Sequence, residues 1–145
     1  MRKTSALILA LLLGFPAAGF SSEALHKIKI TVAGKTINGV LDDNLVANQI
    51  YGMLPFRLSL TELGGREKYG DLPDNVTARG LYTDVYHPGD IGYWSPGNQM
   101  AFYYHDDGQR VPSPGIITIG HFDASGYRIL TDSSTRTLLV ERVDN

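Results

Sequence analysis

The chain has 145 residues, with 13 Lys and Arg against 15 Asp and Glu, and therefore a formal net charge of −2 at pH 7. This slightly acidic balance argues against nucleic acid, or an anionic membrane surface, as the main partner. The sequence contains no cysteine, which excludes disulfides, thiolate catalysis and cysteine-ligated metals.

Residues 1–22 have the pattern of a secretory signal peptide. Arg2 and Lys3 form a basic start, and small residues follow an almost uninterrupted apolar run from Ala6 to Phe15. The run is shorter than the roughly 20 residues of a membrane-spanning helix. We therefore expect cleavage between Gly19 and Ala24, no stable membrane anchor afterwards, and a mature chain that is periplasmic or secreted.

Residues 27–145 have the pattern of one domain that begins with strands. Residues 27–32 and 56–61 alternate polar and apolar side chains, and residues 36–41 supply a partner strand after a turn. Between them, apolar residues at helical spacing predict a helix over 44–54, with its N-cap among Asp42, Asp43 and Asn44 and its end at Pro55. Residues 62–77 contain four Gly or Pro residues and many charges, which predicts a long loop, either functional or simply solvated.

Residues 89–105, GDIGYWSPGNQMAFYYH, hold the only Trp of the chain and are expected to form the central hairpin. Strands over 91–94 and 99–105 would be covered on both faces, or on one face by a ligand. We assign Met100, Phe102 and Tyr104 to the core face. Short strands over 81–86, 116–119 and 137–143 complete a mainly β fold, together with a short helix that Asp123 is expected to cap and that ends near Leu130. The prediction is a closed or half-closed β-barrel with one or two short helices, of which the helix over 44–54 plugs one end.

The order of these elements resembles a bacterial cyclophilin-like domain, a small relative of the cyclophilin barrel. The stretch FRLSLTELGG, from Phe56 to Gly65, is similar to the family's stretch that starts Phe-His-Arg and ends Gln-Gly-Gly. Residues 88–91 and 94–103 resemble the family's Pro-Gly-Ile-Leu and Gly-Ser-Gln-Phe-Phe strands, and residues 117–120 and 124–130 its late strand and helix. The resemblance covers nearly all of residues 27–145 and implies a fold more than an activity.

Carrying over the family's active residues weakens the case for catalysis. Cyclophilins use an Arg two residues after the strand's Phe to stabilise the twisted X-Pro bond, whereas here Arg57 follows Phe56 directly and should point to the opposite face. Gln99 matches a Gln of the family, but Leu63 replaces the Gln before the paired glycines, and Ala101 stands where the family has a pocket Phe. The resemblance implies a non-catalytic module that binds a peptide or small molecule. The alternatives are a periplasmic peptidyl-prolyl cis-trans isomerase that uses Arg57 and a purely structural or interaction protein.

The predicted ligand surface combines aromatic rings, an amide and a carboxylate around one small residue, without a fixed cation. Its residues are Glu62, Tyr69, Trp94, Gln99, Ala101 and Tyr103. Two candidate metal clusters, His105-Asp106-Asp107 and His121-x-Asp123, lack the paired histidines of a cupin-type site. We therefore predict no metal and no cofactor, and a peptide or small-molecule ligand as the partner.

The signal-peptide prediction is tested by the mass of the exported protein. Expression with an intact N-terminus in a host with a general secretion route should yield a chain that begins between residues 19 and 24. An exported product that retains Met1 would contradict this prediction.

Overall fold

The computed structural model describes residue 14 and residues 26–132, 134 and 136–144. Within these residues the chain forms ten strands, two α-helices and one 3-10 turn, η1 (Ser95–Gly97). The helices are α1 (Leu45–Met53) and α2 (Ser125–Thr131). The strands are β1 (His26–Val32), β2 (Lys35–Leu41), β3 (Phe56–Ser59), β4 (Thr61–Leu63), β5 (Glu67–Asp71), β6 (Tyr82–Thr83), β7 (Asp90–Trp94), β8 (Gln99–Tyr103), β9 (Ile116–Phe122) and β10 (Thr137–Arg142).

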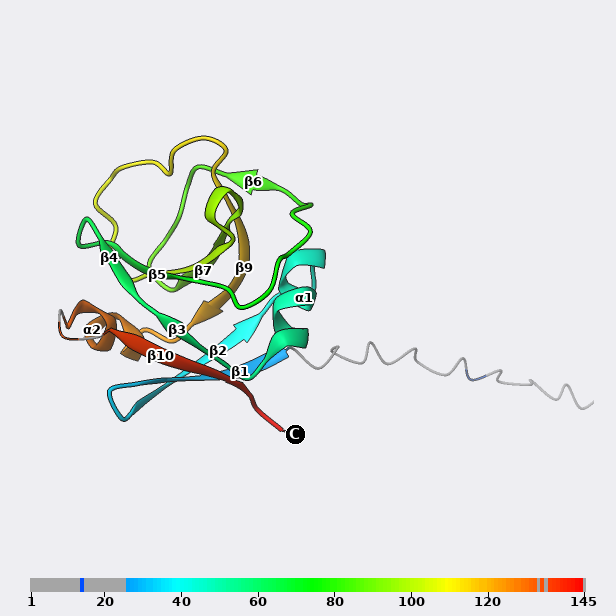
Figure 1. The fold of residues 1–145 in the computed structure, drawn as a ribbon, viewed down its shortest axis with the longest axis horizontal. Coiled ribbons are helices and arrows are strands. Elements are labelled where there is room, and N and C mark those ends of the chain that lie inside the picture. The colour runs from blue at the N-terminus through cyan, green and yellow to red at the C-terminus, as the bar shows by residue number, and fades with distance from the viewer. Residues whose placement is uncertain (1–13, 15–25, 133, 135, 145) are drawn as a thin grey trace, which may run out of the picture.

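The strands form one antiparallel sheet that curves into a nearly closed barrel (Figure 1). Their order is β3-β10-β1-β2-β9-β7-β8-β5-β4, and β6 pairs separately with β9. The two ends of this path, β3 and β4, follow each other in the sequence, so one unsealed seam remains between them. The mainly β barrel with two short helices expected from the sequence is confirmed.

The seam is narrow because β5 crosses close to β3 at a glycine. A Cβ atom at Gly70 would lie 2.5 Å from the carbonyl oxygen of Ser59 and 3.1 Å from the Cβ of Leu58. The first distance is shorter than any ordinary contact, and the atom it involves belongs to the backbone. Only a residue without a side chain allows the two strands to approach in this way.

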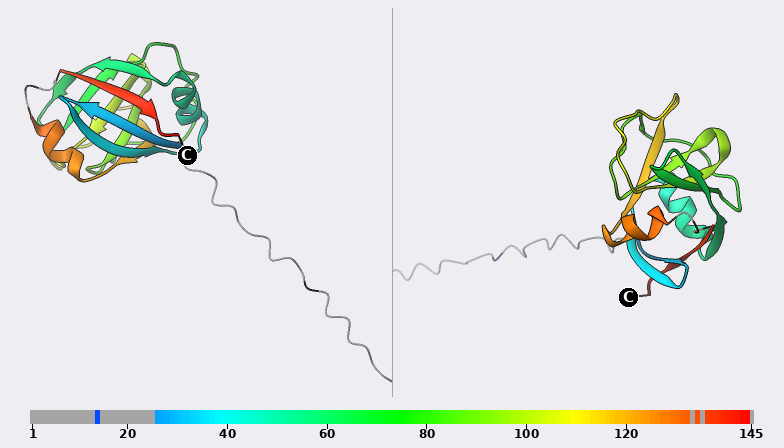
Figure 2. Two further views of the ribbon diagram at one scale, coloured as in Figure 1. Left: turned by 90° about the horizontal axis from the view of Figure 1, so that it is seen from below. Right: turned by 90° about the vertical axis from the view of Figure 1, so that its left-hand side faces the viewer.

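The helices lie at opposite ends of the barrel (Figures 1 and 2). Asn44 is the N-cap of α1, since its side-chain oxygen accepts a hydrogen bond of 2.8 Å from the backbone N–H of Ala47. The expected cap at Asp123 is wrong. The N-cap of α2 is Ala124, which makes no side-chain capping bond, and Asp123 contributes only its backbone carbonyl, which accepts from the N–H of Gly126. No helix in the described part of the chain is long and apolar enough to cross a membrane.

The region expected to be a long loop contains a hairpin instead. Gly64 and Gly65, both with positive φ (62° and 69°), turn the chain between β4 and β5. Paired glycines between two runs of four to six residues favour such a turn, and the many charges of this region obscured that signal. The strand expected over 81–86 is shorter than predicted, since only β6 pairs with a neighbour.

Both faces of β8 are buried. Met100, Phe102 and Tyr104 belong to the main core inside the barrel, as expected. Ala101 and Tyr103 point to the outer face, where they belong to a second buried cluster completed by Tyr86, Val111 and Ile116. The hairpin is therefore covered on both sides by the protein itself.

Phe102 is fully buried at the centre of the main core, so its truncation should leave a large cavity. Phe102→Ala should lower the free energy of unfolding by about 3–5 kcal/mol, measured by denaturant titration. As the control, Leu81→Ala removes a side chain that is 91% exposed and should change stability by less than about 0.5 kcal/mol. Equal effects of the two substitutions would show that the assignment of the core is wrong.

Candidate functional site

A cavity of about 200 Å³ lies on the outer face of β5 and β8, away from the main core. Aromatic and aliphatic side chains form most of its wall, and two charged side chains and an amide complete it. Its lining residues are Leu63, Arg66, Glu67, Tyr69, Trp94, Gln99, Ala101, Tyr103, Val111 and Pro112. An apolar hollow with a few convergent polar groups is the usual form of a small-molecule site.

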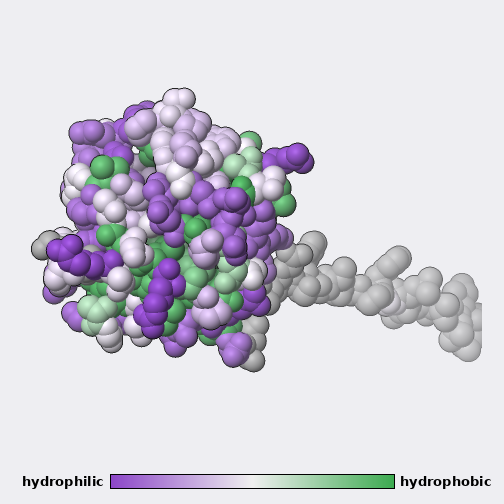
Figure 3. Space-filling view, viewed as in Figure 1, coloured by the Kyte–Doolittle hydropathy of each residue, from purple (hydrophilic) through white to green (hydrophobic). Residues whose placement is uncertain are grey.

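Two larger hollows have no buried charged residue in their walls. One, of about 320 Å³, runs between β2 and β9, and the other, of about 430 Å³, lies beside β6. The structure describes four charged residues as buried, and none of them lines either of these hollows: they are Arg66, Glu67, Lys68 and Asp90. The outer cavity, which contains two of them, is therefore the stronger candidate. The face of the molecule seen in Figure 3 mixes hydrophilic and hydrophobic residues.

The structure brings five of the six predicted ligand residues together. Tyr69 on β5, Trp94 on β7, and Gln99, Ala101 and Tyr103 on β8 all line the cavity. Strand pairing explains this arrangement, because Tyr69 pairs with Ala101 and Trp94 pairs with Gln99. Their role in binding stays a prediction, but their proximity follows from the alternation of side chains along neighbouring strands.

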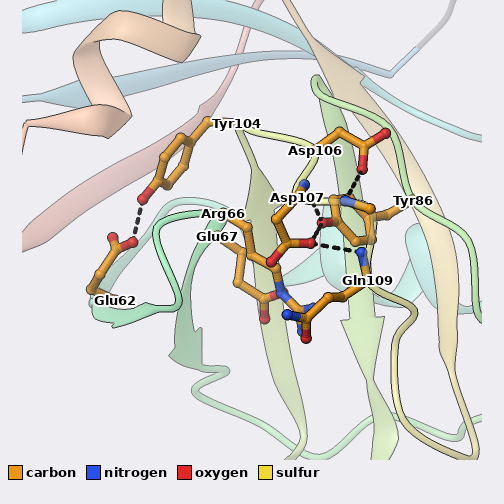
Figure 4. Close-up of polar contacts among 9 residues, drawn as sticks. Glu62, Arg66, Glu67, Tyr86, Tyr104, Asp106, Asp107 and Gln109 are labelled. Carbon is orange, nitrogen blue, oxygen red and sulfur yellow. Dashed lines mark hydrogen bonds and ion pairs between the residues drawn. The ribbon is translucent and has the colours of Figure 1, made fainter.

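Glu62 does not join them. It pairs with Lys68 across the β4–β5 hairpin, on the face opposite to Tyr69. The Tyr104 hydroxyl hydrogen-bonds to Oε1 of Glu62 (Figure 4). Nζ of Lys68 lies 3.1 Å from Oε2 of the same carboxylate. Lys68 also donates to the carbonyl oxygen of Asp132, 2.9 Å away, just after α2. This group therefore fastens the end of α2 to the barrel.

Arg57 does not reach the cavity either. It lies on β3, which pairs with β10 at the far end of the sheet path from β4, and its side chain is exposed. The lining of the cavity includes Gln99 but not Arg57. The two residues that would have to cooperate in an isomerase that uses Arg57 do not share a pocket.

The expectation that the cavity lacks a fixed cation is wrong, because Arg66 lines it. Its Nε donates to Oε2 of Glu67 at 3.1 Å, and its guanidinium lies 5.4 Å from the centre of the Tyr86 ring. Its carbonyl oxygen accepts from the backbone N–H groups of Tyr104 and His105. Arg66 was missed because the region was treated as a loop, although the paired glycines before it would have placed it at the start of a strand.

Burial raises the pKa of Glu67, although the positive charge of Arg66 and a hydrogen bond from the Tyr103 hydroxyl partly offset this effect. The pKa of Tyr103 is also raised, first by burial and then by the charge of Glu67. The cavity thus contains a carboxyl group that keeps its negative charge less readily than an exposed one.

A hydrogen-bonded loop closes one side of the cavity. The Tyr86 hydroxyl donates to Oδ1 of Asp107 at 2.7 Å, and the backbone N–H of Gln109 donates to the same oxygen at 3.0 Å (Figure 4). The Tyr86 ring stacks on Tyr103 with ring centres 4.4 Å apart. This contact fixes the segment after β8 that supplies Val111 and Pro112 to the wall.

Asp90 lies beside two histidines, and Nδ1 of His87 is 3.6 Å from its Oδ2. Nε2 of His121 lies 3.1 Å from Oδ1 of Asp90, on neighbouring strands. Among the residues that the structure describes, no group of three or more His, Asp and Glu residues is arranged to hold a metal ion.

Comparison with known proteins gives one family and one fold. A family model described as the Cyclophilin-like family matches residues 30–141. A similar solved structure is the solution structure of the hypothetical protein AF2241 from Archaeoglobus fulgidus, with a TM-score of 0.65 and 21% sequence identity. The match covers 82% of this chain and 95% of that one, and at this identity it shows the fold alone. No curated protein matches the chain.

The bond between Tyr86 and Asp107 has a measurable signature. The Tyr86 hydroxyl is the main cause that lowers the pKa of Asp107 below its usual value of 3.8. In Tyr86→Phe this pKa should rise toward the usual value, measured by NMR titration of the carboxyl carbon. In Tyr127→Phe, which removes a hydroxyl bonded to the carbonyl of Pro88, it should stay unchanged. The same pKa in all three proteins would contradict the assigned contact.

Proposed function

The chain belongs to the cyclophilin-like family, and from this premise we propose that it is a binding protein whose outer cavity holds a peptide or small molecule without converting it. The observation that carries the proposal is the convergence of Tyr69, Trp94 and Tyr103 around the small residue Ala101 in one cavity. Aromatic walls supply contact area, and the small residue leaves room for an inserted group.

The size of the cavity favours a small guest. Its volume of about 200 Å³ is below the roughly 300–1,000 Å³ of sites that enclose drug-sized ligands. It matches a small molecule or a single apolar side chain of a peptide whose remaining residues stay outside. Leu63, which is 43% exposed at the rim, offers such a peptide a further apolar contact.

Polar groups in the wall supply the orientation that such a ligand needs. The Gln99 amide is held in place because its Nε2 donates to Oδ1 of Asp71 at 2.8 Å. Arg66 is held by its bond to Glu67 and by the ring of Tyr86. Groups fixed in advance lose little freedom when a ligand binds, which supports affinity.

Prolyl isomerisation is the second candidate function. The observation in its favour is that Arg66, a cation, lines the cavity. An isomerase needs a donor aimed at the carbonyl of the twisting bond, in a site built around it. Arg57 is exposed outside the cavity, so this role would fall to Arg66. The Glu67 carboxylate already offsets the charge of Arg66, which reduces the electrostatic stabilisation available to a transition state. Binding is therefore the better supported function.

We also propose that the protein works outside the cytoplasm. The support is the signal-peptide pattern of residues 1–22, most of which lie outside the described residues. A domain without cysteine forms no disulfides and needs no oxidising compartment to fold. The proposal of export therefore rests on the pattern of residues 1–22 alone.

Fluorescence of Trp94, the only Trp of the chain, reports on the cavity directly. Titration of the full chain with short peptides containing leucine or proline should change this signal in a saturable way. Tyr69→Ala should weaken binding at least about tenfold, because it removes one aromatic wall. Tyr51→Ala, which removes a partly buried ring of α1 that packs on His26, is the matched control and should not.

A protease-coupled isomerisation assay on proline peptides separates the two functions. We expect rates near the uncatalysed background for wild type, Arg57→Ala and Arg66→Ala. Robust catalysis that Arg66→Ala abolishes would establish the isomerase in place of the binding protein. Catalysis lost in Arg57→Ala would in addition contradict the boundaries of the site.

A further inference from the structure

The binding function does not explain why a carboxylate is buried in the cavity wall. Glu67 is only 6% exposed and lies beside Arg66, which also lines the cavity. We infer that Glu67 sets the charge selectivity of the cavity: a ligand with an uncharged carbonyl binds at neutral pH, whereas a ligand carboxylate binds only together with a proton. This inference rests on the proposed binding function and names the ligand class of the same site.

Arg66 provides the donors for such a ligand. Its Nε is bonded to Glu67, while its two Nη groups make no hydrogen bond with any described residue. In the described structure no buried side-chain nitrogen or oxygen lacks a partner, so both Nη groups must keep accessible surface. Because Arg66 lines the cavity, that surface is available to an acceptor atom of a ligand. A carbonyl oxygen is the simplest acceptor that fits.

Charge balance distinguishes the two kinds of acceptor. Arg66 and Glu67 together carry no net charge. An uncharged ligand carbonyl therefore accepts a hydrogen bond from Arg66 without adding net charge to the cavity. A ligand carboxylate would make two negative charges share one positive charge, and two carboxylates in one site favour protonation of one of them. Burial already opposes the charge of Glu67 despite Arg66 and raises its pKa, so Glu67 is the group that would take up the proton.

The tyrosine and aspartate side chains around Glu67 do not titrate in the same range. The pKa of Tyr103 on β8 and that of Tyr104 just after it are both raised, so these hydroxyls stay neutral. The pKa of Asp107 is lowered, so this exposed carboxylate stays ionised and adds to the exclusion of anions. His105, whose backbone N–H donates to the carbonyl of Arg66, has an exposed ring and is tested separately below.

The sign of the pH dependence follows from linkage. A bound carboxylate raises the pKa of Glu67 further, so the complex holds more protons than the free protein. The affinity for a ligand carboxylate should therefore increase as the pH falls, by up to about tenfold per pH unit for one proton taken up. The affinity for an uncharged ligand should change little over the same range.

The test compares two probes of the same size that differ in their terminal group: N-acetyl-leucinamide has an uncharged amide and N-acetyl-leucinate a carboxylate. Both are titrated against the full chain between pH 7.5 and 5.5 with Trp94 fluorescence as the signal. The carboxyl group of the second probe stays ionised over this range, since α-carboxyl pKa values are about 3.3–3.7. At pH 7.5 we expect the amide to bind at least about ten times more tightly, and the difference to shrink toward pH 5.5.

Three variants assign the effect. Glu67→Gln should bind the carboxylate more tightly at pH 7.5 and lose the pH dependence, because its amide oxygen can still accept from Nε of Arg66 without a charge. Glu141→Gln changes a carboxylate paired with Lys29 on the other side of the barrel and should behave as wild type. His105→Gln should retain the pH dependence. If Glu67→Gln does not fold, as judged by circular dichroism, the pH series on the wild type still decides.

The outcomes are distinguishable. Tighter binding of the carboxylate by the wild type at pH 7.5, or a carboxylate affinity independent of pH, would overturn the role of Glu67 and leave the binding function in place. Loss of the pH dependence in His105→Gln would assign it to the imidazole instead and overturn the inference as well. No response to either probe, or to the peptides above, would overturn the binding function and this inference together.

Discussion

The ladder between β5 and β8 determines both the interior of the barrel and the cavity outside it. Lys68 and Gly70 pair with Phe102 and Met100 on the inner face, while Glu67 and Tyr69 pair with Tyr103 and Ala101 on the outer face. Because strand side chains alternate, a shift of one residue would exchange the two sets. It would place Glu67 in the main core and Lys68 in the cavity. The register of β5 against β8 therefore determines which charged side chains line the cavity.

Buried charge on both faces of the hairpin is tolerated because each charge has defined partners. Lys68 is 2% exposed and has the Glu62 carboxylate and the Asp132 carbonyl within 3.1 Å. Arg66 and Glu67 bond to each other, and the Tyr86 ring lies beside the guanidinium. A buried charge without such partners would cost several kcal/mol. The hairpin thus has two charged groups. Lys68 with Glu62 holds the end of α2, whereas Arg66 with Glu67 lines the cavity and keeps donors that are partly accessible.

The sequence was sufficient for the strands with clear alternation and for the helix capped by Asn44. It also placed Met100, Phe102 and Tyr104 correctly in the core and brought five of the six predicted ligand residues together, because these assignments depend on a period of two along neighbouring strands. Glu62 was misplaced because its face depends on the turn at Gly64 and Gly65. Arg66 and Glu67 were missed because charged residues are rarely buried, and no local pattern shows that a distant loop covers them.

The position of β10 has a consequence for the order in which the molecule can assemble. The strand β10 lies between β1 and β3, so residues 56–59 find their sheet partner in residues 137–142, and residues 28–31, already paired with β2, find their second partner there. While the chain is being synthesised, β1 and β3 remain without this neighbour until residues 137–142 have been made. Contacts between such distant segments form late and slowly. The sheet therefore reaches its finished form only once β10 has been synthesised, and a chain that stops short of β10 exposes two open edges able to pair with other chains.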